Sequence, residues 1–195
     1  MTHPERNDAV KAVEVLVRYI EKCQNSLREG LQNTPERVID SFDEIFSGYS
    51  NDAKEILDST FNAEGYDGIV LLRDIEFQST CEHHLQPFSG RGHVAYIPVD
   101  RIVGISKLAR LIDMHSKRLQ NQERITQSVA NDLESILKPL GCAVIIEAQH
   151  GCMKCRGVNK QDAVMTTSSM RGVFFDKSEA RTELLQLIRS NPIKG

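Results

Sequence analysis

Two short motifs of metal-binding residue types lie far apart in the chain and constrain its fold more than any other feature. Cys81-x-x-His84 has the spacing at which one turn directs a thiolate and an imidazole to a single ion, and Cys152-x-x-Cys155 offers a second pair. Cysteine and histidine in such pairs are typical zinc ligands. A shared zinc site requires the two segments to meet in the folded chain.

The composition is that of one globular domain. Hydrophobic residues make up 40% of the 195 residues, and the formal net charge is -3, which excludes disordered and fibrous classes and gives no overall attraction to nucleic acid or an anionic membrane. The chain has no run of about 18 apolar residues and no signal peptide at its start. We therefore expect a cytoplasmic protein whose five cysteines are thiols, metal ligands or nucleophiles rather than disulfides.

Hydrophobic periodicity predicts an α+β fold with an antiparallel sheet. Helical spacing predicts helices, and alternation predicts strands, in the order helices 9–23 and 34–48, strands 68–80 and 92–97, helices 106–115 and 122–137, strands 142–150 and 163–175, and helix 178–189. The first two strands form a hairpin across the segment that holds Cys81 and His84. We expect residues 1–8 to be disordered and residues 9–195 to form one domain, with N-terminal helices over 9–58 and a core over about 66–190.

The spacing of the two motifs is compatible with two kinds of zinc site. A closed site would use Cys81, His84, Cys152 and Cys155 and would serve only to hold the fold, whereas an open site would leave one position for water.

Side-chain alternation favours the open site. If the strand from Cys142 continues beyond residue 150, then His150, Cys152, Lys154 and Arg156 share one face, and Cys155 points away from it. An imidazole and two cations beside a metal suit an anionic substrate. A turn after Cys152 would remove this argument.

Other candidate residues lie beside the motifs or at helix starts. His83 and His150 are candidate proton-transfer groups, and the alternative for each is a packed histidine. Ser106, Lys107 and Arg110 occupy one turn at a predicted helix start, which favours anions, although such a triplet is also common on solvated helix ends. Gln122 and Glu123 open the next helix, where a carboxylate can bind a purine edge or complement the helix dipole.

Several motifs, in this order, resemble the zinc-dependent form of GTP cyclohydrolase I over about residues 9 to 190. They are Arg28-Glu29-Gly30-Leu31-x-x-Thr34-Pro35-x-Arg37-Val38, Ser79-Thr80-Cys81-Glu82-His83-His84, Ala95-Tyr96-Ile97-Pro98, Gly104-Ile105-Ser106-Lys107-x-x-Arg110, Gln122-Glu123-Arg124-x-Thr126-Gln127 and His150-x-Cys152-x-x-x-Arg156-Gly157.

The resemblance implies a fold, an assembly and a reaction. The fold is the tunnelling fold, in which the sheets of several subunits close into a barrel and two pentameric rings stack into a homodecamer with active sites between subunits. The reaction converts GTP and water to 7,8-dihydroneopterin triphosphate and formate, the entry to tetrahydrofolate and other pterin synthesis. In it, water activated by Zn²⁺ adds to C8 of the guanine ring and opens it, and an Amadori-type rearrangement and reclosure give the pterin.

The resemblance also implies roles for individual residues. The zinc ligands are Cys81, His84 and Cys152, and His150, assisted by His83, transfers protons. The substrate contacts are Glu123 and the Gln122 region at the guanine edge, Ser106 near the ribose, and a triphosphate-binding set of Lys107, Arg110, Arg156 and Arg37.

Three other interpretations of the sequence are weaker. A zinc nucleobase deaminase would require H-x-E followed by P-C-x-x-C, which the chain lacks. A closed zinc ribbon in an interaction or nucleic-acid-binding module is disfavoured by the net charge of -3. The zinc-independent nitrile reductase branch of the same fold is not expected to hold both Cys-Glu-His-His and His-x-Cys. The pathway that uses the product, a regulatory partner and the metal used in the cell are left open by the sequence.

Overall fold

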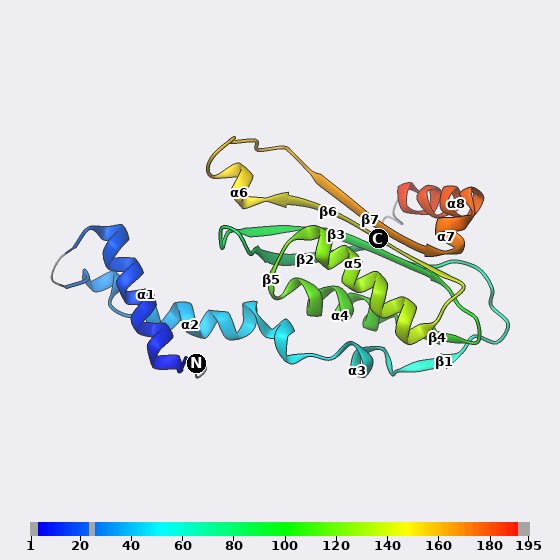
Figure 1. The fold of residues 1–195 in the computed structure, drawn as a ribbon, viewed down its shortest axis with the longest axis horizontal. Helices are drawn as coiled ribbons and strands as arrows, with labels where there is room; N and C mark the ends of the chain where they lie inside the picture. Colours follow the sequence, from blue (N-terminus) through cyan, green and yellow to red (C-terminus); the bar gives the residue numbers. More distant parts are fainter. Residues whose placement is uncertain (1–3, 24–25, 191–195) are drawn as a thin grey trace. The chain divides into compact units, whose positions relative to one another are not determined.

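The computed structural model describes residues 4–23 and 26–190 (Figure 1). Contacts divide the chain into two compact units, residues 1–47 and 48–195. The sequence predicts one domain over residues 9–195, and the second of these units holds all the strands. Among the described residues, the helices are too short or too polar to cross a membrane.

The first unit consists of helices α1 (Arg6–Glu21) and α2 (Thr34–Ile45), with a 3-10 turn at Glu29–Leu31. Helix α1 begins earlier than predicted, because the backbone N–H of Glu5 donates to the Asp8 carboxylate 3.4 Å away and closes the first turn. The expected disorder of residues 1–8 is therefore wrong from Arg6 onward, and residues 1–3 lie outside the described ranges. An ion pair between Arg6 and Asp40 joins the two helices.

The second unit is built on a five-stranded sheet in the order β5-β2-β3-β6-β7. Its strands are β2 (Val70–Cys81), β3 (Pro87–Ile97), β5 (Leu119–Gln120), β6 (Gly141–His150) and β7 (Met165–Gly172). Strands β2, β3, β6 and β7 pair antiparallel, and β5 runs parallel to β2. The predicted hairpin and the α+β class are confirmed.

Helices cover the sheet on both faces. Helices α4 (Ile105–Ser116) and α5 (Gln122–Asp132), the latter continued by a π-helical turn at Leu133–Leu137, pack on one face over a core that includes Phe77, Phe88 and Ile146. Helices α7 (Val173–Asp176) and α8 (Ser178–Arg189) cover the other face at the end where Ala95, Ile97 and Ala143 lie. Figure 1 shows α4 and α5 below the sheet and α8 above it.

Several short elements are absent from the sequence prediction. They are a 3-10 turn at Ser47–Ser50, helix α3 (Ala53–Leu57), helix α6 (Gly151–Lys154), helix α7, strand β5, and a small two-stranded sheet of β1 (Thr60–Asn62) and β4 (Arg101–Val103). Too few residues form each element to show a period, so only their tertiary contacts define them.

Glycines explain two boundaries that the sequence misplaces. Strand β3 begins five residues before Gly92, because Gly90 lets the Glu147 backbone approach so closely that a Cβ would lie 1.8 Å from its carbonyl oxygen. The strand predicted to reach Phe175 ends at Gly172, whose φ of 55° turns the chain into α7.

Candidate metal centre and active site

The sheet brings the two cysteine motifs together. Cys81 ends β2, His84 lies in the turn to β3, and Cys152 lies in α6 directly after β6. Because β3 starts beside both strand ends, with Thr80 opposite Pro87 and Phe88 opposite His150, the turn and α6 meet. One ligand atom from each of Cys81, His84 and Cys152 lies within 4.8 Å of the other two.

Backbone hydrogen bonds hold the turn that carries His84. The N–H groups of His84 and Leu85 donate to the Cys81 carbonyl at 3.3 and 2.8 Å, and the Cys81 N–H donates to the Gln86 carbonyl at 2.8 Å. Leu85 adopts a φ of 52°, in the left-handed region, to close this turn. The ligands are thus presented by a fixed loop rather than a free one.

The donor set fits zinc. Cys81 Sγ and His84 Nδ1 are 3.8 Å apart, whereas tetrahedral zinc with ordinary bond lengths separates sulfur and nitrogen ligands by about 3.6 Å. Burial first, and the adjacent Cys81 second, raise the pKa of the Cys152 thiol. A cation bound between the two sulfurs would favour their thiolate forms, and a soft divalent cation matches two sulfurs and one imidazole.

Cys155 lies outside this group, for a reason that differs from the expected one. Strand β6 does not continue past residue 150; the chain turns into α6 at Gly151, whose lack of a side chain admits the Pro87 carbonyl. The alternation argument for residues 152–156 is therefore wrong. Cys155 is exposed, and its Sγ donates to Gln86 Oε1 at 3.6 Å.

His150 is held on two sides next to the metal ligands. Its ring stacks on Phe88 with centroids 4.5 Å apart and planes 8° from parallel, and its Nε2 lies 2.9 Å from Gln122 Oε1. Burial lowers the pKa of His150, and the nearby Glu123 carboxylate partly opposes this effect. At neutral pH the ring is thus favoured in its uncharged form, which can accept a proton.

His83 is exposed, in contrast to His150. Its Nδ1 lies 3.9 Å from Cys81 Sγ, and its Nε2 lies 3.8 Å from a Glu82 carboxylate oxygen. That carboxylate is held by Arg124 and by Asn121, whose Nδ2 donates to it at 3.1 Å, and the Arg124 hydrogen bond lowers the pKa of Glu82 most. The metal loop is thereby tied to the start of α5. No local pattern in the sequence predicts these roles of Phe88, Asn121 and Arg124.

The predicted substrate residues divide into three groups. Glu123 lines a groove with Thr167 and Arg171 of β7, and its charge acts on His150. The charge of Arg156 acts on Cys152. Glu123 therefore lies near His150, and Arg156 lies near Cys152. Ser106, Lys107 and Arg110 lie in the first turns of α4, beside β4 and at the opposite end of the sheet from Cys81. Arg37 lies on α2, in the other unit.

Gln122 differs from the other predicted substrate residues in its burial. Its region is predicted to lie beside the substrate's base, and its side chain is fully buried. Its Nε2 donates to the carbonyls of Ile146 and Met165 and to the Thr167 hydroxyl. The amide is thus occupied by protein groups.

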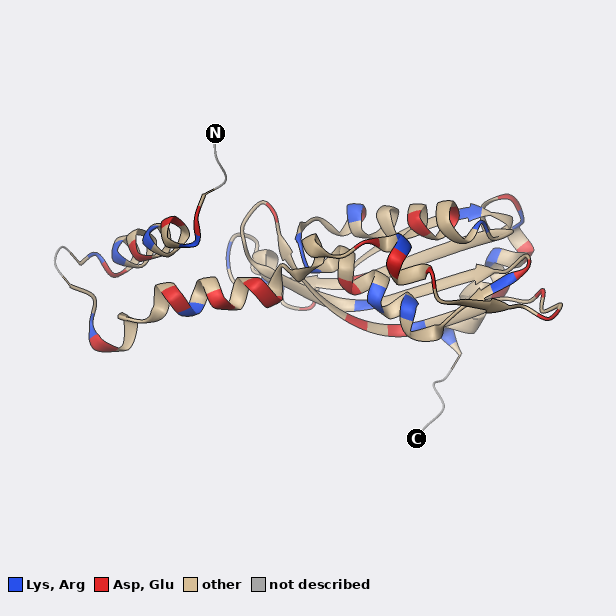
Figure 2. Ribbon diagram, turned by 90° about the horizontal axis from the view of Figure 1, so that it is seen from below, with Lys and Arg blue, Asp and Glu red and all other residues tan. Residues whose placement is uncertain are grey.

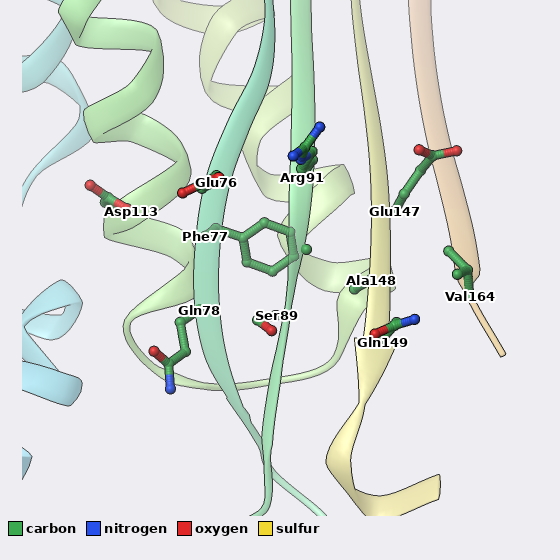
Figure 3. A pocket seen from close by; sticks show the side chains of 11 residues that line it. Glu76, Phe77, Gln78, Ser89, Arg91, Asp113, Glu147, Ala148, Gln149 and Val164 are labelled. Atoms are coloured by element: carbon green, nitrogen blue, oxygen red, sulfur yellow. The ribbon is translucent and has the colours of Figure 1, made fainter. Parts of the chain in front are cut away.

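A second polar surface lies on the opposite face of the sheet. Cross-strand neighbours Glu76, Arg91 and Glu147 form one row, and Gln78, Ser89 and Gln149 form the next (Figure 3). Because residues 149 and 150 point to opposite faces, this surface is separate from His150.

Acidic and basic residues are interspersed along the helices and strands (Figure 2).

Comparison with known proteins identifies the family. The family model for GTP cyclohydrolase I matches residues 9–189. The GTP cyclohydrolase 1 of Synechococcus sp. (strain JA-2-3B'a(2-13)) is 49% identical over 92% of this chain and 78% of its own length. That of Rickettsia prowazekii (strain Madrid E) is 46% identical over 96% of this chain and 98% of its own.

Among solved structures, an archaeosine synthase QueF-like chain in the apo form shares 15% identity, with a TM-score of 0.45 over 54% of this chain and 94% of its own. The match of the family model and the identity to the curated relatives extend over nearly the whole chain. The chain therefore belongs to the GTP cyclohydrolase I family.

Proposed function

We propose that the chain is a GTP cyclohydrolase I. It hydrolyses the imidazole ring of GTP, releases formate and forms 7,8-dihydroneopterin triphosphate, the first step of pterin and tetrahydrofolate biosynthesis. The observation that carries this proposal is the Cys81, His84 and Cys152 cluster beside His150, within a chain that matches the family over residues 9–189.

Cys81, His84 and Cys152 would hold a zinc ion. When bound, zinc supplies a Lewis acid that lowers the pKa of a water molecule. With three protein ligands, such a site keeps one position open, which distinguishes it from a structural zinc site with four.

The chain's own residues supply proton transfer and recognition. His150 exchanges a proton with N7 of the guanine as C8 is attacked, and exposed His83, next to the ligand His84, assists. The Glu123 carboxylate accepts hydrogen bonds from the N1–H and 2-amino group of guanine, which adenine lacks as a pair. Ser106 lies near the ribose, and Lys107, Arg110, Arg156 and Arg37 bind the triphosphate, since guanidinium groups match phosphate oxygens.

We further propose that each active site is completed by a second copy of the chain, within a decamer of tunnelling-fold subunits. The support is the position of Lys107 and Arg110 at one end of the sheet and of the metal ligands at the other. Helix α4 alone is roughly 18 Å long, because an α-helix rises about 1.5 Å per residue. One chain therefore does not bring both groups to one triphosphate.

The five free cysteines support a reducing, cytoplasmic location.

The test of the reaction is incubation of purified protein with GTP, measuring formate and the fluorescence of the oxidised pterin. We expect both products with GTP and neither with ATP, because adenine offers no paired N1–H and 2-amino donors to the Glu123 carboxylate, which a bound base would shield from water. Activity should disappear on zinc removal and return with added Zn²⁺. Full turnover by metal-free protein, verified by elemental analysis, would exclude the proposal.

The test of the shared site is complementation. At a GTP concentration near the wild-type KM, Lys107→Ala chains should be weakly active and Cys152→Ala chains inactive, but random co-assembly should give roughly a quarter of sites with both halves intact. Recovery of formate release on mixing supports the shared site. Mixed oligomers, confirmed by differently tagged chains, that show only the sum of the separate activities would contradict it.

A further inference from the structure

The buried amide of Gln122 has only one orientation that satisfies its neighbours. Its Nε2 lies 2.9 Å from the Ile146 carbonyl and 3.0 Å from the Met165 carbonyl. Carbonyl oxygens only accept hydrogen bonds, so the amide must turn its NH₂ group toward them. Its oxygen, Oε1, consequently faces His150.

This orientation assigns the proton on His150. Gln122 Oε1 lies 2.9 Å from His150 Nε2, and an amide oxygen only accepts a hydrogen bond. Nε2 must therefore carry a hydrogen in either charge state of the ring. In the neutral ring, Nδ1 has the free lone pair.

Stacking on Phe88 fixes the plane of the His150 ring, and the hydrogen bond to Gln122 favours the orientation that turns Nε2 toward the amide. Phe88, itself buried, stacks against one face of the imidazole. The Gln122 amide is held in turn, because its Nε2 lies within hydrogen-bond distance of the Ile146 and Met165 carbonyls and of the Thr167 hydroxyl. Residues of β6 and β7 thus hold the Gln122 amide of α5, which is the hydrogen-bond partner of His150 Nε2.

We propose that Gln122 is a positioning residue that fixes the Nε2–H tautomer of His150, so that Nδ1 is the nitrogen that exchanges a proton with the substrate. The proton taken up at Nδ1 is the one later delivered, while the Nε2–H bond to Gln122 stays intact. This role rests on the proposed function of His150 and replaces a direct contact between Gln122 and the base.

Magic-angle-spinning NMR of the zinc-loaded protein with ¹⁵N-labelled histidine tests the tautomer without any variant. The His150 signals are assigned by their loss in His150→Gln. We expect a protonated Nε2 and, in the neutral ring, an unprotonated Nδ1. A neutral ring protonated at Nδ1 would overturn the proposal. This measurement decides the tautomer even if the wild type fails to release formate from GTP, an outcome that would refute only the proposed function.

Kinetics of Gln122→Met separate positioning from substrate binding. Methionine has a similar length but no amide, so we expect kcat to fall about 10- to 100-fold, as for loss of partners that orient reactive histidines. The KM for GTP and the zinc content should be nearly unchanged, and the His150 spectrum should show a mixture of tautomers. A raised KM with unchanged kcat would instead make Gln122 a substrate contact.

The matched control is Thr126→Val. It removes a hydroxyl from the same buried network but leaves the contact between Gln122 and His150. We expect wild-type tautomer and kcat within about threefold, as for loss of a single hydrogen bond. An equal loss of kcat in Thr126→Val with the tautomer intact would show that disturbance of the core, not positioning of His150, explains the Gln122 variant.

Discussion

The two ends of the large sheet differ in how much of the site one chain builds. At one end, which we term the metal end (Cys81–His84 and His150–Cys152), side chains are held by backbone turns, by the ring of Phe88 and by a buried amide. At the other end, at the start of α4, Ser106 and Arg110 are exposed and Lys107 is half-buried.

Under the proposed function, the difference follows from what each end would do. Metal binding and proton transfer depend on geometry within fractions of an ångström, so rigid elements and their supporting contacts must be preorganised. Binding of a flexible triphosphate tolerates longer, mobile side chains, and a second copy can supply them. We therefore expect changes at the metal end to affect metal content and kcat, and changes at the α4 end to affect KM.

The largest effect is expected at the metal ligands. Cys152→Ala should lose zinc and formate release, because only two protein ligands remain. Cys155→Ala is the matched control, and it should keep one zinc per chain and most of the activity, since its sulfur contacts Gln86 instead. Elemental analysis and formate release measure both variants. Equal loss of metal in the two would indicate a closed structural site.

His150→Ala should have the second-largest effect on formate release. We expect zinc content and KM for GTP to be retained and kcat to fall about 10²- to 10⁴-fold, the usual contribution of a general acid–base group. His115→Gln provides a comparison, because His115 is a buried histidine whose Nε2 lies 2.7 Å from the Asp132 carboxylate and which is not among the predicted site residues. If His150→Ala instead loses zinc while keeping its rate per bound metal, His150 is a ligand.

Lys107→Ala should have a smaller effect, and on a different parameter. Loss of one charge-assisted hydrogen bond to phosphate raises KM for GTP about 10- to 100-fold, with zinc content and the His150 spectrum unchanged. Steady-state kinetics at low and high salt measure this, and the defect should shrink as salt screens the wild-type contact. A loss of kcat with unchanged KM would contradict the division between the two ends.

The smallest effect is expected for the stability of the fold and concerns His93, which lies midway along the sheet. Its Nδ1 accepts a hydrogen bond from the Asp74 backbone N–H, 3.2 Å away. Burial lowers the pKa of His93 from 6.5, while Asp74 and Glu147 partly oppose this and Arg73 and Arg91 add to it. Because the pKa of His93 is lower in the folded chain than in the unfolded chain, the unfolded chain binds a proton at His93 at a higher pH. The free energy of unfolding therefore falls as the pH drops from 6.5 to the pKa of His93 in the folded chain.

His93→Gln should lose less stability on acidification, because the Gln oxygen can still accept the Asp74 N–H and does not titrate in this range. Thermal unfolding midpoints of both proteins at pH 7.5 and 5.5 measure the difference. Identical losses in the two proteins would show that His93 does not contribute. Formate release at pH 7.5 should be unaffected by the substitution, since His93 belongs to neither end.

The sequence by itself determined the long elements and the ligand types. The spacing of Cys81 and His84, the hairpin around them and the amphipathic helices α4, α5 and α8 follow from local periodicity and turn geometry. The family resemblance added Cys152 as the third ligand, and the structure groups it with the other two.

Only the tertiary structure decided how these pieces are used. Alternation along one strand could not foresee that Gly151 turns the chain into α6, because that turn depends on the Pro87 carbonyl of a neighbouring strand. Nor could the position of Gln122 at a helix start reveal that its amide is buried between β6, β7 and His150. Hydrogen-bond partners that are distant in sequence leave no local pattern, so the contact between Gln122 and His150 is visible only in the folded chain.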